Sequence, residues 1–217
     1  MKPTNDNIDV FRRTLLSWWQ GNARDFPWRH NRTPYRTAIA ELMLRRTRAE
    51  QVVPVYNAYM EANPTLEDAS QSAIDTTEAL LYPLGLRWRA QNMTDFVRDA
   101  RSRYGSDLPT SIDELKSLPG VGEYVSAAIA CFAGDQSVAL IDTNVARLLG
   151  RVFGLPVTGE ARRRADVKRL AERCVPDLNP GEYHYAILDF GALICTARRP
   201  KCTSCPIAQY CNFAAKG

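Results

Sequence analysis

The sequence contains no long hydrophobic run. None of its apolar stretches approaches the ~20 residues that a membrane-spanning helix needs, and residues 1–13 hold no apolar segment of the signal-peptide type. We therefore expect a cytoplasmic protein that is not attached to a membrane. With 217 residues and 45% hydrophobic composition, the chain is long enough for one good core or two small ones.

Nucleotide-binding and β-sheet signatures are also missing. The sequence has no G-x-G-x-x-G pattern, no phosphate-binding loop, no internal repeat and almost no strand-like alternation. Helical spacing recurs instead, as in Ile8, Phe11 and Leu15 near the N-terminus. We therefore predict an all-α fold.

The charge is only mildly basic, at a formal +4. This balance permits a nucleic-acid partner without requiring one. The arrangement is more informative, because Arg45, Arg46 and Arg48 cluster, as do Arg198, Arg199 and Lys201. A third run, at 162–164, is interpreted as a solvated face.

Six cysteines are unevenly distributed. Cys131 and Cys174 stand singly in apolar helical contexts, and we expect both to be buried. The other four fall within 17 residues in a C-x6-C-x2-C-x5-C pattern: Cys195, Cys202, Cys205 and Cys211. Four thiolates so spaced can bind one zinc ion or one [4Fe–4S] cluster, although zinc sites usually show two closely spaced pairs. Disulfides are a third interpretation, weakened by the lack of a secretion signal.

A tight turn is predicted at Leu118, Pro119, Gly120, Val121 and Gly122, between two amphipathic helices. Pro119 stops the first helix, the glycines permit left-handed or closely approached backbone, and the second helix begins at about Glu123. Free amides at a helix start form a phosphate site. An ordinary corner of a helical bundle is the alternative.

Asp142 precedes another amphipathic helix, which begins at Thr143. It therefore occupies an N-cap position, where its side chain accepts amide hydrogen bonds and the helix dipole favours negative charge. Capping alone would explain an aspartate here.

LPGVGEY, followed by IDTN some twenty residues later, and the 6-2-5 cysteine spacing resemble the helix-hairpin-helix DNA glycosylases of the endonuclease III superfamily. The resemblance extends to both termini. It implies a six-helix barrel at 25–134 with the hairpin motif at 113–133. It also implies a second helical domain from 1–24 and 135–217, with a DNA cleft between the two. The cluster loop at 195–211 would hold a [4Fe–4S] cluster, in preference to zinc. The implied protein is a nucleoid-associated monomer whose partner is double-stranded DNA with a mismatched or damaged base.

The resemblance also implies roles for individual residues. Asp142 would stabilise the oxocarbenium-like sugar formed when the base of an extruded nucleotide is cut away. The hairpin at 118–122 would grip the DNA backbone. Further DNA contacts would come from two basic groups: Arg45, Arg46, Thr47, Arg198, Arg199 and Lys201.

Two positions indicate which base is removed. Strand-cleaving members carry a lysine where this chain has Tyr124, and tyrosine cannot form their Schiff base with the sugar. Glu41 matches a glutamate of the base pocket, although an isolated helical glutamate would otherwise be taken as solvated. Together with LRRT at 44–47 and DFPWRH at 25–30, these residues resemble the mismatch-specific thymine glycosylases. We predict a monofunctional glycosylase that removes thymine and uracil opposite guanine, with Arg45 and Arg46 as candidate readers of that guanine.

Three alternatives remain. Adenine excision opposite 8-oxoguanine or guanine shares Glu41, RDFPWR and the cluster, but those enzymes commonly have two glutamines at 45–46 and carry a further C-terminal domain, which we expect to be absent here. A non-catalytic binder of damaged DNA would not need Asp142. A zinc-ribbon interaction module would hold zinc in place of iron and sulfide.

Overall fold

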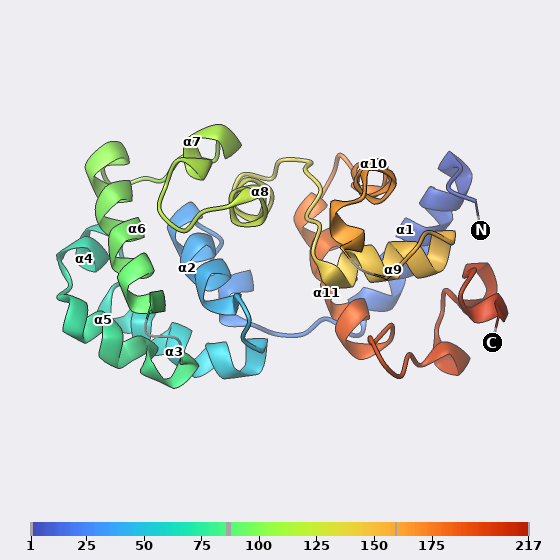
Figure 1. Ribbon diagram of the computed structural model, residues 1–217, viewed down its shortest axis with the longest axis horizontal. Helices are drawn as coiled ribbons and strands as arrows, with labels where there is room; N and C mark the ends of the chain where they lie inside the picture. Colours follow the sequence, from blue (N-terminus) through green and yellow to red (C-terminus); the bar gives the residue numbers. More distant parts are fainter. Residues whose placement is uncertain (1, 86–87, 159, 217) are drawn as a thin grey trace. The chain divides into compact units, whose positions relative to one another are not determined.

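The computed structural model describes residues 2–85, 88–158 and 160–216. Within these ranges the secondary structure consists of α-helices and short 3-10 helices, with no strand (Figure 1). The all-α prediction is confirmed. None of the described helices is long and apolar enough to cross a membrane.

The chain divides into two compact units. Residues 25–134 form one, called here the central unit, and residues 1–24 with 135–217 form the other, called the terminal unit. Each has its own hydrophobic core.

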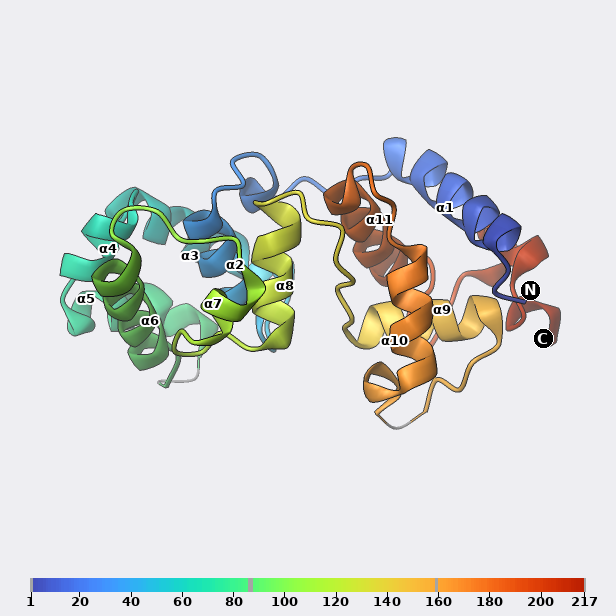
Figure 2. The same cartoon turned by 90° about the horizontal axis from the view of Figure 1, so that it is seen from above.

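The central unit is built around two helices that are buried along most of their length. Its α-helices are α2 (Pro34–Leu44), α3 (Ala49–Ala62), α4 (Leu66–Gln71), α5 (Ile74–Leu81), α6 (Trp88–Tyr104), α7 (Ile112–Lys116) and α8 (Glu123–Phe132). Residues 37–43 of α2 and 125–132 of α8 are buried, and these two helices pack against each other (Figure 2). Helices that are apolar on all sides belong in a protein interior.

The start of α2 is fixed by local chemistry. The Thr33 hydroxyl accepts the amide hydrogen of Arg36 over 3.3 Å, and Pro34 occupies the first helical position. Just before it, the short helix η1 (Pro27–Arg29) inserts Trp28 into the core, stacked on Phe26 with ring centroids 4.9 Å apart.

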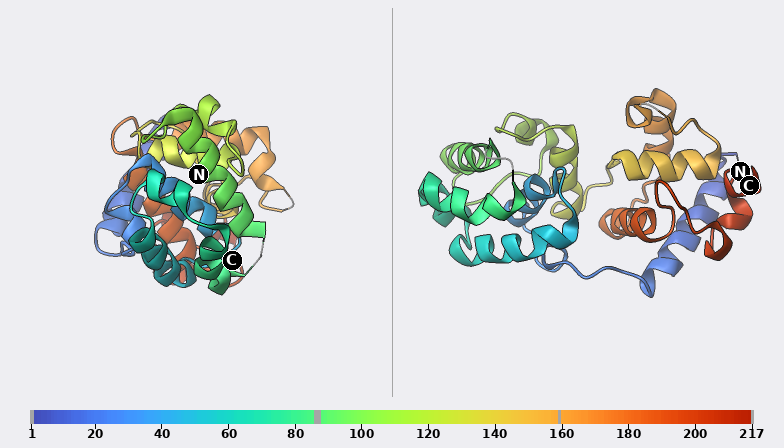
Figure 3. Two further views of the ribbon diagram at one scale, coloured as in Figure 1. Left: turned by 90° about the vertical axis from the view of Figure 1, so that its left-hand side faces the viewer. Right: turned by 60° about the horizontal axis from the view of Figure 1, so that its bottom comes forward.

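The terminal unit joins the two ends of the chain. It contains α1 (Asn5–Gln20), α9 (Thr143–Phe153), α10 (Ala165–Cys174) and α11 (Pro180–Leu193). The first and last described residues lie near each other, and α1 runs beside α11 (Figure 3). Phe11 of α1 meets Phe153 of α9 edge-on at 5.6 Å, so the N-terminal helix completes a core otherwise formed by the C-terminal third of the chain.

Polar contacts reinforce this joining. Arg12 of α1 donates hydrogen bonds to the carbonyls of Arg173, Cys174 and Val175, which end α10. The fully buried carboxylate of Asp189 accepts from the Trp19 indole at 2.9 Å and from the Arg24 guanidinium at 2.7 Å. A carboxylate can be buried with such partners, because its charge is both paired and hydrogen-bonded.

Candidate functional site

The predicted hairpin is present between α7 and α8. Helix α8 begins at Glu123, as expected, with Gly122 as its N-cap. Of the two glycines, only Gly120 is left-handed, with φ of 74°, whereas Gly122 has φ of −99°. A Cβ built on Gly122 would meet no heavy atom of the described residues within 4 Å, so the chain is open on that side.

The hairpin presents backbone and not side chains. Leu118 and Val121 are 3% and 6% exposed and belong to the central core. The amides of Gly120 and Gly122 donate no hydrogen bond within the ranges that the structure covers. Although all five residues at 118–122 were predicted to bind DNA, an external ligand could reach Leu118 and Val121 only at the main chain.

The basic segment after α2 lies against this hairpin. Arg45 donates to the Gly120 carbonyl over 3.2 Å, and its guanidinium lies 5.9 Å from the centre of the Trp88 ring. Arg46 is exposed and has the positive φ of 58°, which is rare for a residue with a side chain. Thr47 is partly buried.

Sequence reasoning missed the residue that holds this segment. Arg89 of α6 is buried and donates to the carbonyls of Met43 and Arg45, both at 2.8 Å, and to the Thr47 hydroxyl at 3.1 Å. It caps the C-terminus of α2, where carbonyls lack helical partners. Burial, and then the charge of Arg45, lower the pKa of Arg89.

Glu41 and Tyr124 come from the two packed central helices. Glu41 of α2 is only 8% exposed, so it is not the solvated residue that an isolated helical glutamate would usually be. Tyr124, in the first turn of α8, is partly buried against the same core. Each therefore reaches the interior side of the helix that carries it.

Asp142 caps α9 in the terminal unit, as predicted. Its Oδ1 accepts the amide hydrogen of Val145 over 2.7 Å, and its Oδ2 accepts from the side-chain amide of Asn144 over 2.8 Å. Both oxygens are thus engaged while the residue stays partly exposed. This carboxylate has a fixed orientation and can face a reacting group.

Arg147, one turn further along α9, joins this capped end to α11. Its guanidinium donates to the carbonyls of Cys195 at 3.0 Å and Gly191 at 2.9 Å. Burial lowers the pKa of Arg147, and the nearby Cys195 and Asp142 act in the opposite direction. A Cβ on Gly191 would lie 3.2 Å from Cβ of Asn144, so the two helices are in close contact beside Asp142.

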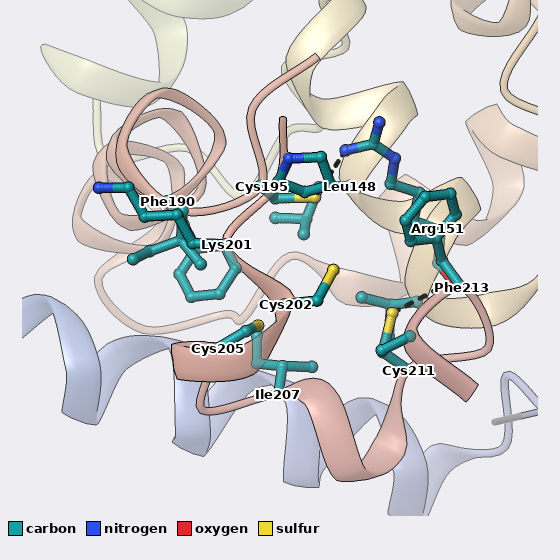
Figure 4. A pocket seen from close by; sticks show the side chains of 14 residues that line it. Leu148, Arg151, Phe190, Cys195, Lys201, Cys202, Cys205, Ile207, Cys211 and Phe213 are labelled. Carbon is teal, nitrogen blue, oxygen red and sulfur yellow. Dashed lines mark hydrogen bonds between the residues drawn. The ribbon is translucent and has the colours of Figure 1, made fainter. Parts of the chain in front are cut away.

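All four C-terminal cysteines line one pocket in the terminal unit (Figure 4). Cys195 follows α11, Cys202 begins the short helix η4 (Cys202–Ser204), Cys205 follows it, and Cys211 follows η5 (Ala208–Tyr210). The pocket is partly open to solvent, and its space outside the protein atoms, open solvent included, is about 330 Å³. The Lys201 amide donates to the Ile194 carbonyl at 2.9 Å and closes the loop from which Arg198 and Arg199 are exposed.

The pocket suits a multinuclear cluster better than a single ion. A tetrahedral zinc site brings its sulfurs to about 3.8 Å from one another. No three cysteine, histidine or acidic side chains in the described ranges are arranged to hold one ion. The thiols surround a cavity instead, and burial raises the pKa of Cys205, with the other three cysteines adding to the rise. A cationic iron–sulfur core would let these thiols ionise together.

A buried cation beside the pocket fits the same group. Arg151 is 8% exposed, and its Nη1 lies 3.4 Å from Sγ of Cys195. Its buried Nε has no hydrogen-bond partner among the residues that the structure describes. None of the six cysteines forms a disulfide, and Cys131 and Cys174 are buried as expected.

Comparison with known proteins agrees with this geometry. A helix-hairpin-helix motif matches residues 103–132, and the iron–sulfur binding domain of endonuclease III matches residues 195–211. The thymine/uracil-DNA glycosylase of Methanothermobacter thermautotrophicus is 33% identical over 214 residues, which cover 98% of this chain and 97% of that protein. The chain belongs to the endonuclease III superfamily of DNA glycosylases.

Within this superfamily, the structure of a thermostable thymine-DNA glycosylase superposes with a TM-score of 0.90 and 32% identity, covering 98% of this chain and 99% of that one. The adenine DNA glycosylase of Rattus norvegicus is 32% identical over 218 residues, and this chain covers 42% of it. The predicted family, fold, DNA partner, DNA glycosylase activity and iron–sulfur cluster are confirmed.

Proposed function

We propose that this DNA glycosylase is monofunctional and excises thymine and uracil paired with guanine by hydrolysis of the N-glycosidic bond. The observation that carries the proposal is Tyr124 in the first turn of α8, two residues after Gly122. A phenol cannot form the Schiff base on which lysine-dependent strand cleavage depends. The thymine and uracil in the names of the similar glycosylases support the same substrates.

Asp142 is the proposed catalytic carboxylate. Loss of the base leaves positive charge on the sugar, and a carboxylate held in place stabilises that charge without reorganising during the reaction. The hydrogen bonds from Asn144 and Val145 supply this fixed orientation. Asp142 would also orient the attacking water.

Glu41 and Tyr124 are proposed to recognise the extruded base. An enzyme that acts on a base must take it out of the duplex and enclose it in a pocket with polar groups for its edge. A buried glutamate and a half-buried tyrosine from packed helices have that character.

DNA binding is assigned to three parts of the chain. In the hairpin, the amides of Gly120 and Gly122 would face a phosphate, with Leu118, Pro119 and Val121 shaping the turn. Arg45, Arg46 and Thr47 would lie near the mispaired guanine. Arg198, Arg199 and Lys201, all exposed on the cluster loop, would meet further phosphates.

The cluster is proposed to be held by Cys195, Cys202, Cys205 and Cys211. When bound, it supplies a cross-link that closes the loop and ties the C-terminal segment to α9 and α11. We also propose that the protein is located in the cytoplasm together with the DNA.

An excision panel tests this function. Labelled duplexes would carry T·G, U·G, U·A, A·8-oxoguanine and A·G, each analysed with and without alkali. We expect product from T·G and U·G only after alkali, and none from Asp142→Asn, which should still bind the duplex. Cutting confined to the adenine duplexes would reassign the enzyme, and strand cleavage without alkali would refute the monofunctional mechanism.

A further inference from the structure

Arg151 is a buried cation without a carboxylate partner in the described part of the chain. Its Nη1 donates to the Thr196 carbonyl at 2.7 Å and its Nη2 to the Ala197 carbonyl at 2.9 Å, while Nη1 also lies 3.4 Å from Sγ of Cys195. Burying an uncompensated charge is costly, and carbonyl dipoles offset only part of that cost. The site therefore calls for a negative group in the adjoining pocket.

The last part of the chain covers this guanidinium. The Phe213 ring centre lies 4.6 Å from Cζ of Arg151, and Figure 4 places both side chains at the pocket wall beside Cys211. The Phe213 amide and the Cys211 thiol both donate to the Arg151 carbonyl, at 3.0 and 3.4 Å. Phe213 is itself 42% exposed, so it stands between Arg151 and solvent.

Four thiolates around an iron–sulfur cube carry net negative charge, and hydrogen bonds to their sulfurs and exposure to solvent set its reduction potential. Arg151 affects both the hydrogen bonding and the solvent exposure, because it donates to the sulfur of Cys195 and because Phe213, which packs over it, limits the access of water. We propose that Arg151, shielded by Phe213, is the charge-compensating residue of the cluster and controls both its reduction potential and its retention. The inference is independent of which base the enzyme excises.

A role for Arg151 as a purely structural tie is the rival interpretation. Its bonds to the Thr196 and Ala197 carbonyls would hold the loop in either case. Two substitutions distinguish a role of the Arg151 charge from a purely structural role. Arg151→Lys keeps the charge but cannot make both hydrogen bonds, whereas Arg151→Met keeps much of the side-chain length but removes the charge.

The test uses the cluster-loaded protein. A mediated redox titration followed by electron paramagnetic resonance gives the midpoint of one-electron reduction, and a chelator assay gives the rate of iron release. For Arg151→Met we expect the equilibrium constant for reduction to fall at least tenfold, a shift of about 59 mV to more negative potential, and iron release to accelerate about tenfold. For Arg151→Lys we expect the equilibrium constant for reduction to differ less than tenfold from that of the unsubstituted protein.

Two further variants complete the design. Arg162→Met removes an exposed arginine of the same unit and should change neither measurement. Phe213→Leu keeps Arg151 and its hydrogen bonds, and should change the potential by less than Arg151→Met does. An unchanged potential in loaded Arg151→Met, or equal iron loss from the Lys and Met variants without any shift, would overturn the proposal. If Arg151→Met does not take up the cluster, the amount of cluster taken up becomes the measurement. We then expect Arg151→Lys to take up the cluster and Arg151→Gln not to. Equal cluster content in these two variants would overturn the proposal.

Discussion

The side-chain amide of Asn144 donates a 2.8 Å hydrogen bond to Oδ2 of Asp142 across the first turn of α9. The Val145 amide binds the other oxygen at 2.7 Å. Because one contact comes from the main chain and one from a side chain, only the second can be removed without changing the helix.

We expect Asn144→Ala to slow excision about 10- to 100-fold while leaving DNA affinity nearly unchanged. A hydrogen bond to a charged group contributes roughly 1.5–3 kcal/mol, and its loss would let the Asp142 carboxylate rotate. Single-turnover kinetics at saturating enzyme, beside a separate binding titration, measures this. Thr143→Ala, at the exposed neighbouring position, is the control. A full single-turnover rate in Asn144→Ala would show that the amide does not position Asp142.

The two hairpin glycines should respond differently to alanine. Gly120 has φ of 74°, a conformation that costs a residue with a Cβ roughly 1–2 kcal/mol, so Gly120→Ala should lower both stability and DNA affinity. Gly122 has an allowed φ and open space around its missing Cβ, so Gly122→Ala should fold normally. Because the added methyl group would obstruct a phosphate that approaches the Gly122 amide, the affinity of Gly122→Ala for duplex DNA should still fall. Wild-type affinity in a stable Gly122→Ala would place the DNA backbone elsewhere.

Tyr124→Lys should convert the enzyme to one that also cleaves the strand. A lysine at the start of α8 would offer an amine to the sugar, and the resulting Schiff base permits β-elimination. Borohydride should then trap a covalent protein–DNA complex that is absent with the wild-type protein. Tyr124→Met, of similar length but without an amine, should yield none. Failure to trap any complex with a folded lysine variant would mean that residue 124 does not face the sugar.

The cluster loop should contribute to the salt dependence of binding. Each phosphate contact adds about 0.9 to the slope of log affinity against log salt concentration. Replacing exposed Arg198 and Arg199 by glutamine should therefore reduce the slope by up to about 1.8. The matched pair Arg162→Gln and Arg163→Gln, on an exposed 3-10 turn, should leave it unchanged. Equal effects of the two pairs would mean that net charge, and not the loop, determines binding.

The sequence predicted the features that depend on local signals. The start of α8 at Glu123 and the capping of α9 by Asp142 follow from residues within one turn, and both were found as expected. Arg89 and Arg151 were missed because their acceptors lie more than 40 residues away in the chain. The burial of Glu41 does not follow from its local sequence, because an isolated helical glutamate is usually solvated and the packing of α2 into the core overrides this preference.

His184 should make the terminal unit less stable in acid. Its Nε2 lies 2.9 Å from the Val138 carbonyl, in the segment leading to Asp142, and its buried Nδ1 has no partner in the described ranges. Burial lowers its pKa from 6.5 to about 4, although the Val138 contact acts in the opposite direction. The folded state thus resists protonation, whereas the unfolded chain binds a proton below about pH 6.5.

The sign follows from this difference in proton binding. Between about pH 6.5 and 4 the unfolded state holds more protons, so stability is complete above that range and falls as the pH is lowered through it. The full loss is about 3 kcal/mol. Urea unfolding across this range should show a smaller loss for His184→Gln, which keeps a donor for Val138 but cannot titrate. Since acid damage to the cluster would affect both proteins alike, the difference between their pH profiles isolates His184, and identical profiles would exclude it as a source of acid sensitivity.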